Sequence, residues 1–241
     1  MSDPLAIIGG AGAGLGQTLV RAFAQNGYTP MGLNRSVPDG AAGTTHAVDL
    51  SDPEQTSQTV SDLIQTHGAP KLVVHNAAKL VIAGFEDTTT ADFEATWRAM
   101  VLSAVNLARS VLPAMVEDGG GTFIVSGATA SLRGGKNFAA FASAKAGLRA
   151  LTQSLAREYG PQGIHVVHVV LDGIVDTDSS RALHSMDPAR MMKPEDIART
   201  YLALADLHGP PGRMSWTSGR WERRSDADRY LDCGRWFVGS C

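Results

Sequence analysis

The chain has 241 residues, of which 44% are hydrophobic, 19% charged and 6% aromatic, with a formal net charge of −3 at pH 7. This length is enough for one domain with its own core, and the near-neutral charge excludes a general attraction to nucleic acid or to an anionic membrane. No uncharged apolar stretch is long enough to span a bilayer, and no basic segment precedes the first apolar run. We therefore expect a soluble cytoplasmic protein.

Short apolar runs alternate with amphipathic segments along the chain. The apolar runs predict strands, and the amphipathic segments, several of which end at glycine, predict helices. The predicted strands are 5–8, 28–33, 44–50, 71–75, 122–126 and 164–171, and the predicted helices are 16–26, 52–67, 91–116, 141–159 and 193–207. Because strands alternate with helices and are apolar throughout, we predict the α/β class, with a doubly wound parallel sheet and helices on both faces.

Residues 209–241 depart from this pattern. They contain six arginines, three of the four tryptophans and both cysteines, Cys233 and Cys241. A charged helical cap would have such a composition, and so would a tail translated in a different reading frame. We therefore separate a single folded domain, residues 1–208, from an atypical tail, residues 209–241. Cysteines confined to such a tail cannot frame a disulfide-built fold.

Glycines follow the first predicted strand. Gly10, Gly14 and Gly16 have the spacing G-x-x-x-G-x-G. Glycines at this place let the backbone turn tightly and approach a pyrophosphate, whose charge then lies at the N-terminus of the next helix. A glycine-rich turn required only for packing fits the same pattern.

Three further motifs accompany these glycines in chain order. They are His75-Asn76-Ala77-Ala78 after the fourth strand, Phe141-Ala142-Ser143-Ala144-Lys145, and Asp172-Gly173-Ile174-Val175-Asp176-Thr177 after the sixth strand. Over roughly residues 5–207 the chain resembles the short-chain dehydrogenase/reductase family. The resemblance implies a Rossmann-type fold, oxidoreductase activity on a small carbonyl or alcohol, a nicotinamide dinucleotide cofactor, and a homodimer or homotetramer.

The resemblance also implies a cofactor site at the ends of the strands. It would consist of Gly10, Gly14, Leu15 and Gly16 at the phosphates, Asp49 at the adenine, Asn76 near the adenosine-side ribose, Lys145 at the nicotinamide ribose, and Gly173 and Thr177 at the nicotinamide. Where a carboxylate would bind the ribose 2′-hydroxyl, this chain has Asn34 and Arg35. A cation without an acid favours NADP(H) over NAD(H), although a solvated surface arginine is the alternative.

The catalytic positions depart from the family pattern. Members use a tyrosine and a lysine at Y-x-x-x-K, a serine thirteen residues before the tyrosine, and usually an asparagine on the preceding long helix. Lys145 is present, but Phe141, Ala128 and Met100 occupy the other three positions. Because phenylalanine has no proton to give, the ordinary acid–base step cannot run through residue 141.

Substitutes for the missing groups lie nearby in the sequence. Thr129 and Ser131 flank the vacated serine position, and Asp172 lies beside the expected nicotinamide, where burial would make it a proton donor. A structural Asp172 that caps a turn or pairs with Lys145 is the simpler alternative. An oxidoreductase with weak catalysis and a non-catalytic dinucleotide-binding sensor or partner subunit therefore both remain open.

Histidines give no metal prediction. His165 and His168 are three apart in one strand and so point to opposite faces, which is poor geometry for a shared ligand. His75 either meets the dinucleotide or packs in the core.

Overall fold

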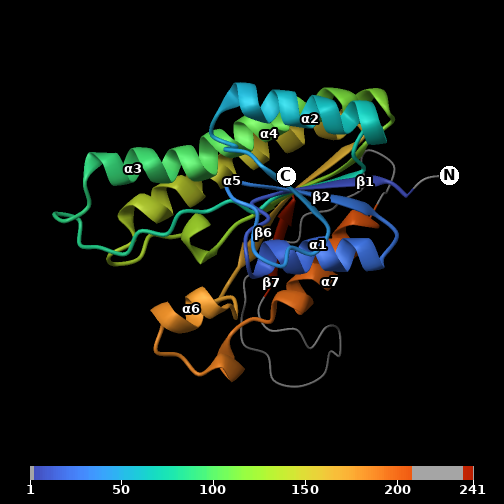
Figure 1. Ribbon diagram of the computed structural model, residues 1–241. Coiled ribbons are helices and arrows are strands. Elements are labelled where there is room, and N and C mark those ends of the chain that lie inside the picture. Colours follow the sequence, from blue (N-terminus) through green and yellow to red (C-terminus); the bar gives the residue numbers. More distant parts are fainter. Residues whose placement is uncertain (1–2, 208–235, 241) are drawn as a thin grey trace, which may run out of the picture.

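The sheet has seven strands in the order β3-β2-β1-β4-β5-β6-β7 (Figure 1). This computed structural model describes residues 3–207 and the backbone of residues 236–240. Each neighbouring pair from β3 to β6 is parallel. The six parallel strands are β1 (Leu5–Gly9), β2 (Thr29–Asn34), β3 (Thr44–Ala47), β4 (Leu72–His75), β5 (Gly121–Ser126) and β6 (Ile164–Leu171). The predicted fold class is confirmed.

Helices cover both faces of the sheet, with α1 and α7 on one side and α2, α4 and α5 on the other (Figure 1). Successive side chains of a strand point to opposite faces. Leu5 and Ile7 therefore join one buried cluster, while Ala6 and Ile8 join the other. Burial on both faces explains why the strands are continuous apolar runs. The helices are α1 (Leu15–Gln25), α2 (Pro53–His67), α4 (Ser103–Glu117), α5 (Ala139–Tyr159) and α7 (Pro194–Ala205).

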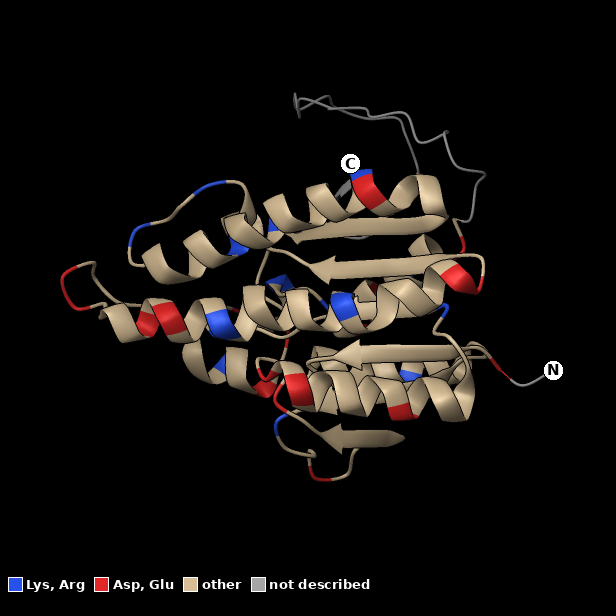
Figure 2. Cartoon of the chain, turned by 90° about the horizontal axis from the view of Figure 1, so that it is seen from above, with Lys and Arg blue, Asp and Glu red and all other residues tan. Residues whose placement is uncertain are grey.

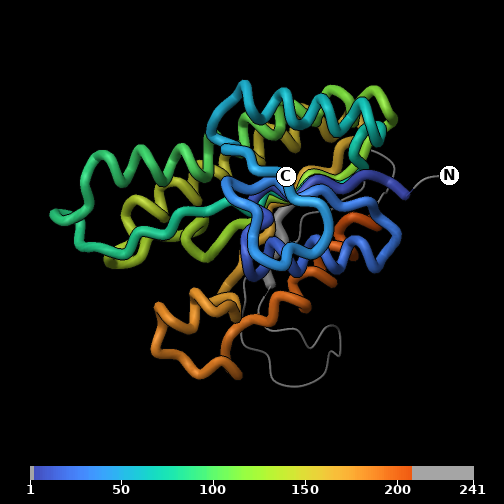
Figure 3. The backbone as a smooth tube through the Cα atoms, viewed as in Figure 1, coloured from blue at the N-terminus to red at the C-terminus, as the bar shows by residue number. Residues whose placement is uncertain are grey.

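The strand order reverses at β1, which has β2 on one side and β4 on the other. In open parallel sheets, a ligand crevice forms at this reversal, beyond the carboxyl ends of the strands. The short helix α6 (Asp178–Leu183), which follows β6, projects away from the main body on this side (Figure 3). The fold thus positions a cleft where the glycines and the motif residues end their strands.

Two predicted elements differ in detail. The predicted helix 91–116 is α3 (Thr90–Trp97) and α4 separated by a π turn, η1 (Arg98–Leu102). The predicted strand 44–50 ends at Ala47. Beyond it, the Asp49 carboxylate accepts a hydrogen bond from the backbone N–H of Ser51 at 2.9 Å, which turns the chain toward α2.

The tail contributes one described element, β7 (Trp236–Ser240), which pairs antiparallel with β6. The six strands predicted from the sequence do not include this one, so β7 adds a seventh strand to the predicted sheet. Residues 208–235 and residue 241, and with them most of the predicted tail and both cysteines, lie outside the described residues.

The helical stretch Thr90–Glu117 is the one candidate membrane span among the described residues. It has 28 residues, and half of its most apolar window is buried within the fold. Acidic and basic residues are interspersed along the helices (Figure 2).

Candidate cofactor and active site

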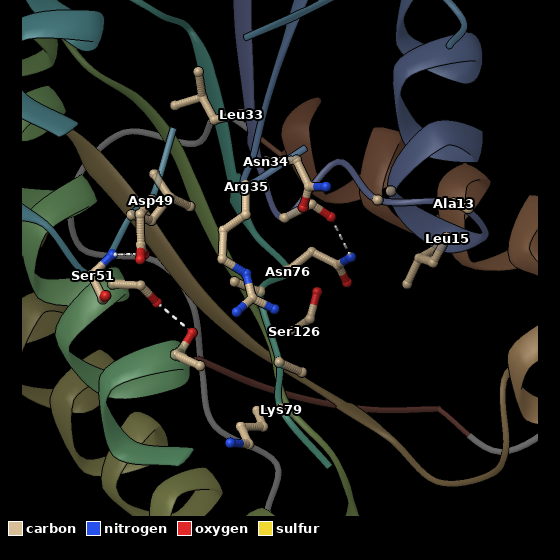
Figure 4. A pocket seen from close by; sticks show the side chains of 18 of the residues that line it. Ala13, Leu15, Leu33, Asn34, Arg35, Asp49, Ser51, Asn76, Lys79 and Ser126 are labelled. Carbon is tan, nitrogen blue, oxygen red and sulfur yellow. Dashed lines mark hydrogen bonds between the residues drawn. The ribbon is translucent and has the colours of Figure 1, made fainter. Parts of the chain in front are cut away.

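A cavity of about 600 Å³ opens at the carboxyl ends of the parallel strands (Figure 4). Its walls come from the β1–α1 loop, the ends of β2 to β6, the region where α3 meets η1, and α5. Nine predicted cofactor residues line it: Gly10, Leu15, Gly16, Asn34, Arg35, Asp49, Asn76, Lys145 and Thr177. Residues from six separate segments thus meet at one site.

The glycines allow backbone segments to approach closely beside this cavity. A Cβ atom at Gly10, whose φ is +84°, would lie 2.4 Å from the backbone nitrogen of Ala77. A Cβ atom at Gly16 would lie 2.5 Å from the carbonyl oxygen of Gly10. No side chain caps helix α1, and the N–H of Gln17 donates to the carbonyl oxygen of Gly12 at 3.1 Å. Among the described residues, no acceptor is recorded for the N–H groups of Leu15 and Gly16, which can therefore meet an anion. This arrangement fits a dinucleotide pyrophosphate.

The end of β2 supplies a cation to the cavity. The Arg35 side chain is exposed and points into the cavity (Figure 4), and no ion pair of Arg35 occurs within the described part of the chain. Asn34 donates from Nδ2 to the carbonyl oxygen of Ser36 at 2.8 Å. Asp49, the one acid of the lining, is held by Ser51. A ribose 2′-phosphate would therefore meet a positive group here.

Lys145 lies at the opposite end of the cavity and is buried. Its Nζ donates to the carbonyl oxygen of Ser126 at 2.7 Å and lies 5.6 Å from the centre of the Phe141 ring. Burial lowers the pKa of Lys145 to about 8. The Ser126 hydroxyl in turn hydrogen-bonds the hydroxyl of Tyr201 in α7 at 2.8 Å, and burial raises the pKa of this tyrosine. A buried polar chain therefore supports the lysine from behind.

The vacated catalytic positions are filled by packing. Met100 is fully buried within η1. Phe141 packs on the core and meets Phe138 edge to face, with ring centres 6.5 Å apart. Ser131, one proposed substitute, accepts from the backbone N–H of Ala128 at 3.1 Å and hydrogen-bonds Nε2 of His168 at 3.0 Å. Its hydroxyl is therefore already engaged within the protein.

Asp172 differs from its sequence-based prediction. It is exposed rather than buried, so the condition under which it was expected to donate a proton is not met. It accepts a hydrogen bond from the Thr129 hydroxyl at 2.6 Å, whereas Lys145 donates to Ser126, so the suggested Asp172–Lys145 pair does not form. The Thr129–Asp172 pair bridges the segments that follow β5 and β6.

Two other predicted cofactor residues do not line the cavity. Gly173 is exposed, and a Cβ atom there would lie 2.9 Å from the sulfur of Met192. Gly14 packs against Thr177, where a Cβ atom would lie 2.6 Å from the side-chain methyl group. Both glycines therefore shape the walls through close packing.

The histidines at the strand ends are core residues. His75 is fully buried and its Nε2 hydrogen-bonds the Ser103 hydroxyl at 2.8 Å, so the packing alternative holds. Burial, followed by the positive charge of Lys145, lowers the pKa of His75 and of His168 to about 3. Both rings are therefore neutral at pH 7. Among the described residues, no group of three or more His, Cys, Asp or Glu could hold a metal ion.

Sequence reasoning missed several residues at this cavity. Lys79 follows the His75–Ala78 motif directly, and Arg98 begins the π turn; both line the cavity. Ser126 also lines it, at the end of a strand that otherwise reads as apolar. The position of Lys79 after a strand was a usable signal, whereas the direction of Arg98 depends on the π turn.

A sequence profile described as short chain dehydrogenase matches residues 4–188. The chain belongs to the short-chain dehydrogenase family. A probable galactose dehydrogenase of Rhizobium meliloti is 27% identical over 224 residues, 87% of each chain. The 3-oxoacyl-(acyl-carrier-protein) reductase FabG of Thermotoga maritima is 24% identical over 225 residues, covering 85% of this chain and 91% of the reductase.

Solved structures of similar fold include ElxO with NADP bound, with a TM-score of 0.79 and 19% identity over 86% of this chain and 93% of ElxO. A tyrosine-to-phenylalanine variant of ElxO with NADPH bound has a TM-score of 0.78. A gluconate 5-dehydrogenase from Burkholderia cenocepacia, in complex with NADP and tartrate, has a TM-score of 0.76 at 22% identity, over 85% and 89% of the chains. These likenesses confirm the fold. Members of the family are NAD(P)-binding oxidoreductases and are generally soluble.

Proposed function

We propose that this protein is an NADP(H)-binding oxidoreductase for a small carbonyl or alcohol, with catalysis weakened by Phe141, Ala128 and Met100. The preference for NADP(H) rests on Arg35. This side chain points into the cavity at the end of β2 and has no ion-pair partner among the described residues. Two similar structures, ElxO and a gluconate 5-dehydrogenase, contain NADP.

In this proposal, the chain holds the dinucleotide mainly through its backbone. The loop from Gly10 to Gly16 would receive the pyrophosphate, and Arg35 the 2′-phosphate. Lys145 would bind the nicotinamide ribose, a role that needs no tyrosine. When bound, the cofactor supplies or accepts a hydride. These residues would orient it at the end of the cavity that Thr177 and Ser126 line.

The proton that accompanies hydride transfer lacks its usual carrier. Phe141 has no hydroxyl, Ser131 is bonded to His168, and Asp172 is exposed and does not line the cavity, so solvent water is left to supply the proton. General acid–base help is worth about 10²–10⁴ in rate. We therefore propose slow turnover on generic carbonyl substrates.

The cofactor proposal is tested by titrating NADPH and NADH into the wild type and into Arg35→Ala by calorimetry. A charge-assisted contact contributes roughly 1.5–3 kcal/mol, and less for an exposed group such as Arg35, so we expect about tenfold weaker NADPH binding with NADH unchanged. Arg157→Ala, which changes an exposed arginine of α5, is the control. Equal wild-type affinities for NADPH and NADH would overturn the assignment.

A second candidate is a non-catalytic dinucleotide-binding protein that acts as a sensor or partner subunit. The packing of Phe141 on Phe138 and the burial of Met100 favour it, because both vacated positions are filled with apolar groups. Incubation with NADPH and a panel of aldehydes and ketones separates the candidates. Measurable oxidation of NADPH supports the enzyme, whereas tight binding without turnover supports the sensor.

We also propose that the protein is cytoplasmic and forms a homodimer or homotetramer through α3, α4 and α5. Trp97 and Leu102 are exposed, and the exposed small residues Ala146 and Ala150 on α5 permit close helix contact. Sedimentation at micromolar concentration tests the assembly. A 25.4 kDa species alone would contradict it. The substrate would be a small molecule, and no nucleic-acid or membrane partner is proposed.

A further inference from the structure

We propose that Lys145 is a carbonyl-capturing amine, which forms an imine with aldehydes or ketones that carry an anionic group. This activity goes beyond the proposed function and does not depend on it. It rests on how the amine is placed at the cavity wall, on what surrounds its nitrogen, and on the charge of the remaining lining.

Lys145 lines the cavity although the residue is only 4% exposed, so the side chain is enclosed by the fold except at the cavity wall. An ammonium group has three hydrogens to donate. Among the described residues, one acceptor is recorded for this group, the carbonyl oxygen of Ser126 at 2.7 Å. The lysine is thus short of polar partners.

Around the Lys145 nitrogen, the described residues place an aromatic ring and no carboxylate. The face of Phe141, 5.6 Å away, attracts a cation weakly but accepts no conventional hydrogen bond. In the described part of the chain, Lys145 has no carboxylate partner within ion-pair distance. A buried ammonium without a counterion is costly, so the neutral amine is favoured.

The amount of neutral amine follows from the lowered pKa of Lys145, about 8. At pH 7, about one amine in ten would be neutral, against about one in three thousand for a lysine with the ordinary pKa of 10.5. The neutral amine is the nucleophile in imine formation, and lysines desolvated in a pocket are activated in this way.

The charge of the lining selects the kind of carbonyl compound. Arg35, Lys79 and Arg98 line the same cavity as Lys145, against one acidic residue, Asp49. The Asp49 carboxylate already accepts a hydrogen bond from Ser51. A phosphorylated aldehyde or a keto acid would therefore bring a charge that the lining lacks.

The reaction needs no reagent besides the carbonyl compound. The Lys145 nitrogen attacks the carbonyl carbon and forms a carbinolamine. Loss of one water molecule, made from the carbonyl oxygen and two hydrogens that leave the nitrogen, gives the C=N bond. The step is reversible and changes no oxidation state. Borohydride added afterwards donates a hydride to the imine carbon, and solvent protonates the nitrogen, which fixes the adduct as a secondary amine.

The test uses pyridoxal 5′-phosphate, an aldehyde that carries a phosphate group, with the full-length protein. After brief incubation and borohydride reduction, peptide mass spectrometry locates and counts the adducts. We expect Lys145 to be labelled at least tenfold faster than any exposed lysine at pH 7. Its labelling rate should level off above about pH 8, while the rates of exposed lysines go on rising. Uniform labelling over the exposed lysines would overturn the proposal.

Two variants serve as matched controls. Lys145→Arg keeps the positive charge but cannot form an imine, and Lys79→Arg makes the same change at the other lysine of the cavity. The fast adduct should disappear in the first and persist in the second. An unchanged fast phase in a folded Lys145→Arg protein would also overturn the proposal. Should this variant fail to fold, the peptide map of the wild type still decides.

Protection by NADPH separates this inference from the proposed function. If both hold, NADPH slows the labelling of Lys145, because the two ligands share the cavity. Fast labelling that NADPH does not slow would support the amine and count against cofactor binding at this site. Slow labelling of Lys145 together with tight NADPH binding would overturn the imine proposal and support cofactor binding at this site.

Discussion

At the end of the cavity beside β1 and α1, the walls are largely backbone, whereas at the end beside β5 and α5 they are side chains. Gly10 and Gly16 leave no room for a Cβ atom, so the shape of the first end is fixed by the chain trace. Near the second end lie Phe141, Ala128 and Met100, apolar residues at the positions where the family pattern predicts polar groups. A binding site whose walls are backbone keeps its shape when side chains are substituted. A proton relay made of side chains can be lost through one substitution.

The largest expected effect comes from restoring the side chains of the second end. The double variant Phe141→Tyr with Ala128→Ser should raise turnover of NADPH with a carbonyl panel by about 10²–10⁴, because it returns a proton donor beside Lys145. Stopped-flow or steady-state assays of the nicotinamide absorbance measure this turnover.

Asp172→Asn is the companion experiment. Because Asp172 is exposed and does not line the cavity, this change should leave the turnover of the protein unchanged. Fast wild-type turnover that persists in Asp172→Asn would mean that the cavity end beside β5 and α5 still supplies a proton. The proposed difference between the two ends would then be wrong.

The first end is tested by adding a methyl group. Gly10→Ala would place a Cβ atom 2.4 Å from the backbone of Ala77, at a φ of +84°. The loop must shift, and we expect NADPH binding by calorimetry to weaken about 100-fold, since the backbone has to approach the pyrophosphate closely.

Gly134→Ala is the control outside the cavity. Nothing lies within 4 Å of a Cβ atom at Gly134, and this residue does not line the cavity. A change of less than threefold in NADPH binding is expected there. Equal losses in the two variants would show that close backbone approach at Gly10 is not the reason.

A smaller effect is expected on how the stability of the protein depends on pH. It arises from the two buried histidines, His75 in β4 and His168 in β6. Their folded-state pKa values, about 3, lie below the ordinary value of 6.5. The unfolded chain therefore binds more protons as the pH falls below 6.5, and the protein loses stability down to about pH 3. Each histidine contributes a slope of about 1.4 kcal/mol per pH unit.

Urea unfolding between pH 6 and 4.5 measures this slope. His168→Gln should reduce it by about 1.4 kcal/mol per pH unit, and so should His75→Gln. His67→Gln, which changes an exposed histidine of α2, is the control. An unchanged slope in both buried variants would mean that these rings are already charged or are solvated in the folded protein.

The sequence predicted most of the fold because its signals are local. Short apolar runs mark β1 and the parallel strands that follow it, and the spacing of Gly10, Gly14 and Gly16 marks the crevice. Other features depend on contacts between distant segments. The hydrogen bond from Ser126 to Tyr201 joins residues 75 positions apart. The π turn that carries Arg98 has no marker residue, and the exposure of Asp172 follows from the path of the chain after β6.

The Ser126–Tyr201 pair has a consequence for how this protein can change over time. Both hydroxyls are buried and each satisfies the other. If one hydroxyl is removed, the other is left buried without a hydrogen-bond partner, which costs about 1–3 kcal/mol of stability. Replacing both side chains with apolar groups of the same shape changes the stability little. In the lineage of this protein the two positions should therefore be inherited as a unit, both polar or both apolar, with mixed pairs rare.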